Sequence, residues 1–167
     1  MTLPTVDFLI NNMSSDLQNL LDQRNIRQPA MVGIHTGGAW VAKSLHQQLA
    51  LDQALGLLDI TFYRDDFTQK GLHPSVKTSN LPFTTDEQHI ILVDDVISSG
   101  RTIRAALNEL FDYGRPASVI LVTLVDVPGR DLPIQPDIIG ERLDLAPQQR
   151  VKLHGPDNMH LTITQVN

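Results

Sequence analysis

One segment near the middle of the chain joins an apolar run, two acidic residues, a loop of small residues and a helix. The apolar run at residues 90–93 leads directly into Asp94 and Asp95, and Ser98, Ser99 and Gly100 follow. Beyond Gly100, apolar residues fall at helical spacing, which predicts a helix with one buried face. They are Ile103, Ala106, Leu107, Leu110 and Phe111. A strand followed at once by a loop and a helix is the unit of parallel sheets, so this segment favours an α/β fold.

The rest of the chain repeats this alternation of strands and helices. Helices are expected at residues 6 to about 24 and after a glycine turn at residues 37–38. Strands are expected at 30–34, 57–63, 119–125, 137–140, 151–153 and 161–166. The predicted fold class is therefore α/β, with a central, mostly parallel sheet flanked by helices on both faces. In such sheets the ligand lies beyond the carboxyl ends of the strands.

The composition excludes several kinds of protein. The chain has no cysteine, which rules out disulfide scaffolds, thiolate zinc sites and cysteine nucleophiles. A net charge of −6 disfavours nucleic-acid binding, because phosphate neutralisation needs a basic surface. The amino-terminal residues show no secretory signal, and the longest apolar stretch, at 119–125, is too short to cross a bilayer. A cytoplasmic protein without a membrane partner is expected.

The central segment also has the chemistry of a site for a phosphorylated sugar. The backbone N–H groups of residues 99–102 are expected to be free, because the first turn of a helix has no internal partners for them. With the helix dipole they form an anion site, and Gly100 lets a phosphate approach the backbone. Asp94 and Asp95 suit hydroxyl groups, or a Mg²⁺ ion that phosphate also holds. The chain has neither a Walker A loop nor a GxGxxG motif.

Residues 91–102 resemble the phosphoribosyl-diphosphate (PRPP) motif of type I phosphoribosyltransferases. Residues 31–38, 58–66, 76–77 and 113–117 resemble the PyrR group of that family, pyrimidine operon regulators that are also uracil phosphoribosyltransferases. The resemblance implies a type I phosphoribosyltransferase fold and the reaction of uracil with PRPP to give UMP and pyrophosphate. It also implies one domain over 1–167, with a mobile flap at about 64–88 and a small carboxyl-terminal hood at about 126–167. A homodimer or a dimer of dimers is expected.

The resemblance implies a role for each matched segment. Asp94 and Asp95 would take the ribose hydroxyls and the shell of a PRPP-bound Mg²⁺. A pyrophosphate loop with a cis peptide bond that does not precede proline would consist of His35, Thr36, Gly37 and Gly38. The phosphate and ribose of PRPP would be bound by Val96, Ile97, Ser98, Ser99, Gly100, Arg101 and Thr102. Arg101 would face either the ligand or a neighbouring loop.

Two further groups of residues follow from the resemblance. Arg64 and Lys77, in the flap, would neutralise the pyrophosphate charge, while closure of the flap would exclude water. The base would lie under the hood, with Ile138 as an apolar lid and main-chain groups near Ile139 as partners. Asp126 would border this pocket. The position after Asp126, where PyrR proteins typically have Arg, is Val127 here, which predicts the loss of a contact in the base site or between loops.

Three other interpretations compete with a uracil phosphoribosyltransferase. A sensor that binds PRPP or a nucleotide without turnover would act on RNA or on a partner protein. A phosphoribosyltransferase for another base would share the fold, because the fold does not set the base. A response-regulator receiver would need a Lys at the end of its last sheet strand, and the chain has no Lys between Lys77 and Lys152.

Overall fold

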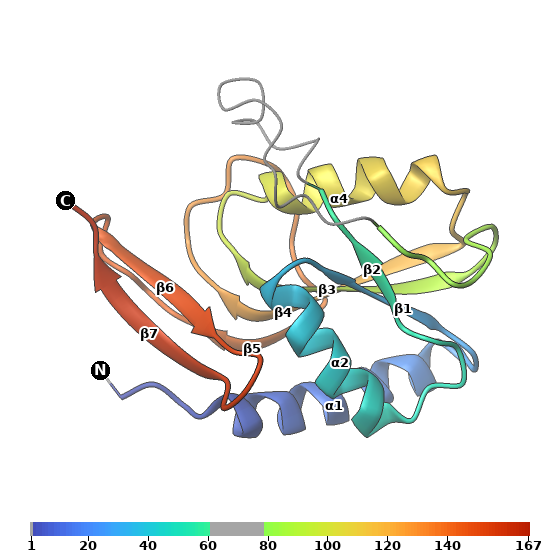
Figure 1. The fold of residues 1–167 in the computed structure, drawn as a ribbon, viewed down its shortest axis with the longest axis horizontal. Coiled ribbons are helices and arrows are strands. Elements are labelled where there is room, and N and C mark those ends of the chain that lie inside the picture. Colours follow the sequence, from blue (N-terminus) through green and yellow to red (C-terminus); the bar gives the residue numbers. More distant parts are fainter. Residues whose placement is uncertain (1, 61–78) are drawn as a thin grey trace.

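The structure is a computed structural model that describes residues 2–60 and 79–167, with a five-stranded parallel sheet at its centre (Figure 1). The strand order is β2-β1-β3-β4-β5, and every neighbouring pair in this sheet is parallel. A separate antiparallel hairpin pairs β6 with β7. The elements are α1 (Val6–Gln23), β1 (Ala30–Ile34), α2 (Gly37–Leu49), β2 (Gly56–Leu58), β3 (His89–Ile97), α4 (Arg101–Asp112), β4 (Ser118–Asp126), β5 (Ile138–Arg142), β6 (Gln149–His154) and β7 (His160–Gln165).

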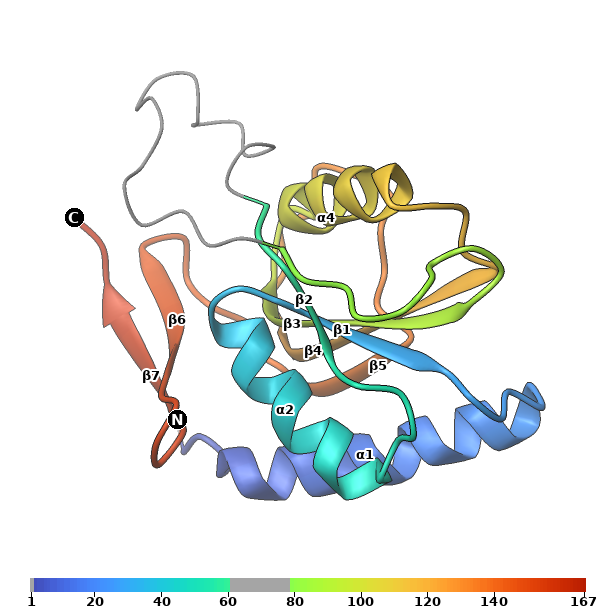
Figure 2. The same cartoon turned by 45° about the vertical axis from the view of Figure 1, so that its right-hand side comes forward.

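Helices cover both faces of the sheet, as predicted. Figure 2 shows α1 and α2 on one face and α4 on the other. Alternate residues of β3 divide between these two faces, as the period of a strand requires. Ile91 and Val93 pack with Met13 and Leu17 of α1, whereas Ile90 and Leu92 pack with the apolar face of α4. The α/β fold class inferred from the sequence is therefore confirmed.

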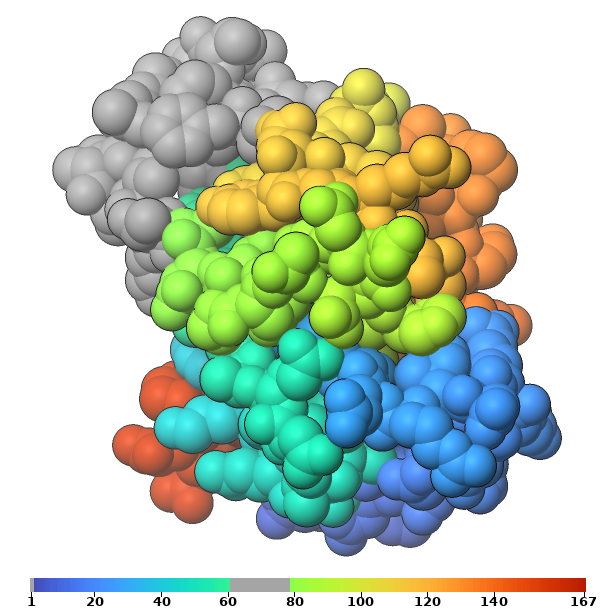
Figure 3. Space-filling view, turned by 90° about the vertical axis from the view of Figure 1, so that its right-hand side faces the viewer, coloured from blue at the N-terminus to red at the C-terminus, as the bar shows by residue number. Residues whose placement is uncertain are grey.

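The two ends of the sheet differ. Figure 3 shows the amino-terminal end, where the loops that precede the strands pack side by side. Gln53 Nε2 donates to the Gln28 carbonyl at 2.9 Å and to Gln88 Oε1 at 3.0 Å. The Ala117 N–H donates to the Gln88 carbonyl at 2.8 Å, which ties a fourth loop to the other three. Hydrogen bonds between loops therefore close this end.

Two strand boundaries differ from the expectation. The predicted strand at 57–63 is β2, which ends at Leu58 because the Asp59 N–H donates to Ser79 Oγ at 2.8 Å instead of to a neighbouring strand. Residues 61–63 lie outside the described residues. The predicted strand at 90–93 is longer than expected, since β3 stays paired with β4 as far as Ile97. Asp94 and Asp95 therefore belong to the strand itself.

The helices of the described residues include none that is long and apolar enough to cross a membrane. The cytoplasmic location, the extent of the flap at about 64–88 and the hood at about 126–167 stay predictions. The hairpin of β6 and β7 lies at the left in Figure 1, on the side where β3 and β4 end.

Candidate active site

Asp94 and Asp95 lie where two neighbours of β3 diverge. The pairing of β1 with β3 ends at Val93, whereas β4 continues beside β3 to its last residue. Asp94 is buried, and its Oδ1 accepts a hydrogen bond from the Asp95 N–H at 2.9 Å. Asp95 Oδ1 accepts one from the Val96 N–H at 2.8 Å. Both carboxylates are thus held by the backbone of the residue that follows, at the carboxyl-terminal end of the sheet.

The predicted pyrophosphate loop, residues 35–38, packs directly against these two acids. The peptide bond between His35 and Thr36 is cis, as the family resemblance implied. An added Cβ at Gly37 would lie 2.8 Å from Asp95 Cγ, and one at Gly38 would lie 2.7 Å from the Val93 carbonyl oxygen. At Gly38 the obstacle is backbone, so only glycine fits at that position. The structure therefore brings together two segments that are 56 residues or more apart in the sequence.

The phosphate loop, residues 98–102, leads into the first turn of α4. Gly100 precedes the helix with a φ of 91°, a left-handed conformation that favours glycine. The Arg101 N–H donates to Ser99 Oγ at 3.1 Å. The expectation that every N–H of residues 99–102 is free is wrong for Arg101, because its N–H already donates to the Ser99 hydroxyl. The positive end of the α4 dipole still points at this loop.

A loop after β4, residues 127–134, lies against the phosphate loop. The N–H groups of Asp131 and Leu132 donate to the Ser99 carbonyl at 2.9 and 3.2 Å. Arg101 Nε lies 3.5 Å from Asp131 Oδ2, and both side chains are more than half exposed. Of the two orientations left open for Arg101, this ion pair places its side chain toward the neighbouring loop.

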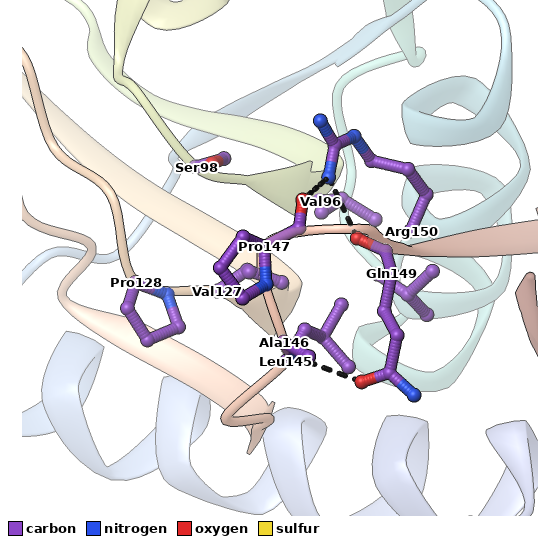
Figure 4. A pocket seen from close by; sticks show the side chains of 10 residues that line it. Val96, Ser98, Val127, Pro128, Leu145, Ala146, Pro147, Gln149 and Arg150 are labelled. Atoms are coloured by element: carbon purple, nitrogen blue, oxygen red, sulfur yellow. Dashed lines mark hydrogen bonds between the residues drawn. The ribbon is translucent and has the colours of Figure 1, made fainter. Parts of the chain in front are cut away.

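A pocket of about 300 Å³ opens at the same edge of the sheet (Figure 4). Its walls come from the ends of β3 and β4, the segment before β6 and the start of β6. The lining residues are Val96, Ser98, Val127, Pro128, Leu145, Ala146, Pro147, Gln149, Arg150 and Val151. It adjoins the phosphate loop through Ser98, and we use the name base pocket for it only as a label.

Hydrogen bonds within the wall fix the shape of the base pocket. Arg150 Nη1 donates to the Pro147 carbonyl at 2.9 Å and to the Gln149 carbonyl at 2.7 Å. The Ala146 N–H donates to Gln149 Oε1 at 2.9 Å, so the Gln149 side chain closes the turn (Figure 4). The predicted hood at about 126–167 contains the segment 145–151, but the sequence prediction named no residue of this segment for the site. Its only sequence signal is Pro147, which indicates a turn just before a strand.

The residues predicted to hold the base occupy two different places. Asp126 ends β4 at the edge of the site and is buried, with its carboxylate between Arg130 and Arg142. Ile138 and Ile139 begin β5 and pair with residues 122 and 123 of β4. These partners lie four and three residues before Asp126 on β4, which is about 13 and about 10 Å at 3.3 Å per residue. Ile138 belongs to the core beneath α1. Neither isoleucine is among the residues that line the base pocket, and their contact with the base stays a prediction.

The other predicted residues concern charge and metal. Arg64 and Lys77 lie outside the described residues. Among the residues that the structure describes, no group of three or more His, Asp or Glu side chains could hold a metal ion by itself. Two adjacent carboxylates beside a polyphosphate site are nevertheless the donor set that Mg²⁺ uses when substrate phosphates supply its other ligands. The residues present fit a cation that arrives with its substrate.

Comparisons with known proteins agree with this geometry. Residues 8–144 match the family model of the phosphoribosyl transferase domain. The chain belongs to the phosphoribosyltransferase family. This phosphoribosyltransferase is 60% identical to Bifunctional protein PyrR of Pseudomonas aeruginosa over 156 residues, which is 93% of this chain and 92% of that protein. It is 52% identical to Bifunctional protein PyrR of Nitrosococcus oceani over 164 residues, or 97% and 93% of the two chains. The chain thus belongs to the PyrR group, as the resemblance indicated.

Solved structures show the same fold at low sequence identity. The hypoxanthine phosphoribosyltransferase of Trypanosoma cruzi superposes with a TM-score of 0.70 at 14% identity, covering 99% of this chain and 96% of that one. A hypoxanthine-guanine phosphoribosyltransferase of Bacillus anthracis gives a TM-score of 0.68 at 17% identity, covering 86% and 84%. The expected type I phosphoribosyltransferase fold is therefore confirmed.

Proposed function

We propose that this phosphoribosyltransferase transfers the phosphoribosyl group of PRPP to uracil, giving UMP and pyrophosphate. The observation that carries the proposal is the meeting of four parts at one edge of the sheet. The acid pair, Asp94 and Asp95, lies near the carboxyl end of β3, and the pyrophosphate loop, the phosphate loop and the base pocket adjoin it at the carboxyl ends of β1, β3 and β4. The membership in the PyrR group supports uracil as the base.

The two loops bind different parts of PRPP. The start of α4 receives the 5′-phosphate, because its dipole and the Thr102 hydroxyl favour an anion. Residues 35–38 receive the pyrophosphate, where the absence of side chains at Gly37 and Gly38 leaves the backbone accessible. Asp94 and Asp95 lie between the two anion sites and accept hydrogen bonds from the ribose hydroxyls.

The acid pair also holds the metal ion that accompanies PRPP. Asp94 and Asp95 would bind Mg²⁺ together with oxygens of the substrate, and the bound ion would neutralise charge on the pyrophosphate as it leaves. Within residues 2–60 and 79–167, no third acidic or His side chain joins the pair to make a metal site, which agrees with a cation that is delivered as a complex with PRPP.

The base pocket suits a small planar ring with polar edges. Val96, Val127 and Val151 provide apolar walls, and Ser98, Gln149 and Arg150 are the polar residues among those that line the pocket. In pockets of this type, apolar walls contact the two faces of a planar ring, and a few polar groups at its edge give specificity. Arg150 and Gln149 hold the turn at 146–149 in one conformation and thereby fix the position of this wall.

In the reaction, the bond from C1′ to the pyrophosphate oxygen breaks and the bond from C1′ to N1 of uracil forms. Positive charge develops at C1′, so the work of the protein is to hold both partners in line and to stabilise charge. The pyrophosphate takes the electron pair of the broken bond. We assign no side chain as the base that accepts the N1 proton.

The proposal is tested by competition among bases. Purified protein with Mg²⁺ and PRPP is supplied with uracil, cytosine, hypoxanthine or guanine, and the nucleotide products are separated by chromatography. The proposal predicts UMP as the main product. Inosine or guanosine monophosphate as the main product would instead indicate a purine enzyme, and PRPP binding without any nucleotide product would indicate a sensor.

Regulation of a pyrimidine operon is the second proposed function, because the relatives at 52–60% identity carry the name bifunctional. The net charge of −6 predicts that RNA binding has only a small electrostatic component. Titration of labelled leader RNA from the pyrimidine operon at two salt concentrations tests both points. Light scattering of the same samples tests the proposed homodimer or dimer of dimers.

A further inference from the structure

The side chain of Arg130 connects the phosphate loop to the base pocket. Arg130 lies in the loop after β4, and only 16% of its side chain is exposed. Its Nη1 donates to the Ser98 carbonyl at 2.8 Å and to the Val127 carbonyl at 3.2 Å. Ser98 and Val127 both line the base pocket, and Ser98 is also the first residue of the phosphate loop. The Nη1 atom of Arg130 therefore donates hydrogen bonds to two residues that line the base pocket, Ser98 and Val127.

The other nitrogen atoms of Arg130 fix the orientation of the guanidinium. Nε donates to the Ile134 carbonyl at 2.7 Å, and Nη2 donates to Asp126 Oδ1 at 2.8 Å and to Gln135 Oε1 at 3.1 Å. A guanidinium has five N–H groups, and these contacts together with those of Nη1 supply an acceptor for each of them. The Asp126 carboxylate, anchored at the end of β4, carries the opposite charge and balances the buried cation.

We propose that Arg130 is a positioning residue for the transfer reaction. By holding the Ser98 and Val127 carbonyls on one guanidinium, it fixes the distance between the phosphate loop and the base pocket. The phosphoribosyl group and the base then meet in one geometry, which is what the reaction requires of the protein. This inference rests on the proposed function.

Lysine cannot replace arginine in this role. The acceptors of Arg130 are spread over three nitrogen atoms of a planar fork, whereas an ammonium group presents its three donors from one atom. Arg142 provides a matched control, because it pairs with the other oxygen of the same carboxylate, Asp126 Oδ2, at 3.3 Å. Its side chain is 66% exposed, and among the described residues its one hydrogen bond is to Asp126.

The test compares Arg130→Lys with Arg142→Lys in steady-state kinetics, at a temperature where thermal unfolding shows each variant to be folded. In Arg130→Lys we expect KM for PRPP and for uracil to rise about tenfold, the effect of losing roughly one charge-assisted hydrogen bond. Arg142→Lys should match the wild type. A merely structural role would lower the amount of active protein, and so the apparent kcat, without moving either KM. Arg130→Gln serves if Arg130→Lys does not fold.

Calorimetric titration with PRPP separates this inference from the proposed function. If the wild type binds PRPP but forms no UMP, the proposed function fails, and a weaker PRPP affinity in Arg130→Lys than in Arg142→Lys still supports the positioning role. Equal affinities and equal KM values in the two variants would overturn it. A wild type that does not bind PRPP would overturn both.

Discussion

The Asp95 carboxylate lies against the Cα atom of Gly37, in the space that a side chain at position 37 would fill. An added Cβ there would be 2.8 Å from Asp95 Cγ and 3.2 Å from Asp95 Cβ. The pyrophosphate loop and the acid pair are therefore packed as one unit. A substitution in one of them must move the other.

We predict that Gly37→Ala and Gly38→Ala have different consequences. At Gly37 the obstacle is a side chain that can rotate, so Gly37→Ala should displace the Asp95 carboxylate and lower PRPP turnover with little loss of stability. At Gly38 the obstacle is backbone, with the Val93 oxygen at 2.7 Å and Asp94 Cα at 2.9 Å. Gly38→Ala should therefore lower both turnover and stability, by about 1–3 kcal/mol of unfolding free energy. Urea unfolding and an activity assay together check the contrast, and equal effects of the two changes would contradict it.

Asp95→Asn should remove a negative charge from the acid pair without changing the local backbone. The asparagine Oδ1 can still accept the hydrogen bond from the Val96 N–H, so the local backbone should be retained. Loss of the negative charge should lower kcat/KM for PRPP by about 10²-fold, as for the removal of one preorganised electrostatic contact. Asp112→Asn, an exposed change in the last turn of α4, is the control. Unchanged kinetics in Asp95→Asn would mean that this carboxylate is not in the site.

Glu109 should make the stability of the protein depend on pH. Its Oε1 accepts a hydrogen bond from Ser79 Oγ at 2.5 Å, while Oε2 is buried without a partner in the part of the chain that the structure describes. Burial, assisted by the charges of Asp59 and Asp112, raises the pKa of this carboxyl above its ordinary value, although the Ser79 bond acts in the opposite direction.

The sign of this pH dependence follows from the raised pKa. The folded protein keeps the Glu109 proton to a higher pH than the unfolded chain does. The free energy of unfolding should therefore fall as pH rises from the ordinary glutamate pKa through the folded one. Glu109→Gln removes this contribution. Urea unfolding of both proteins between about pH 4 and pH 8 measures it as the difference between them, and a difference that does not vary with pH would contradict the prediction.

Two adjacent residues of α1 test the packing of the helix on the sheet. Leu9 is 1% exposed in the core, whereas its neighbour Phe8 is 58% exposed. Leu9→Ala should lower the free energy of unfolding by about 2–5 kcal/mol, because it leaves a cavity. Phe8→Ala should change it by about 0.5 kcal/mol or less. A large loss in Phe8→Ala would show that this face of α1 is covered in solution, and Leu9→Ala without effect would contradict the docking of α1.

The sequence predicted the parts of the fold that depend on local pattern. The segment from residue 90 to the end of α4 has an apolar run, a glycine with a required left-handed φ and a clear helical stripe. Each of these is set by neighbours in the sequence. The close approach of residues 35–38 to the acid pair came from the family resemblance, since no pattern in the sequence connects segments so far apart.

The base pocket and Arg130 could not be predicted in this way. The segment 145–151 reaches the site only because the hairpin of β6 and β7 lies beyond the end of the sheet, a tertiary arrangement. The Arg130 side chain has backbone carbonyls as most of its partners, and these carry no residue-type signal. Ile138 and Ile139 were assigned to the base by the family resemblance alone, and that assignment stays a prediction.

The most direct test of the central claim is the stoichiometry of the reaction. Purified protein is incubated with Mg²⁺, PRPP and uracil, and UMP and pyrophosphate are quantified in the same samples over time. Transfer to uracil predicts equal amounts of UMP and pyrophosphate, with neither formed when uracil is omitted. Pyrophosphate released without UMP would show hydrolysis of PRPP instead of transfer, and the absence of both products would contradict the assignment of this site to uracil phosphoribosyl transfer.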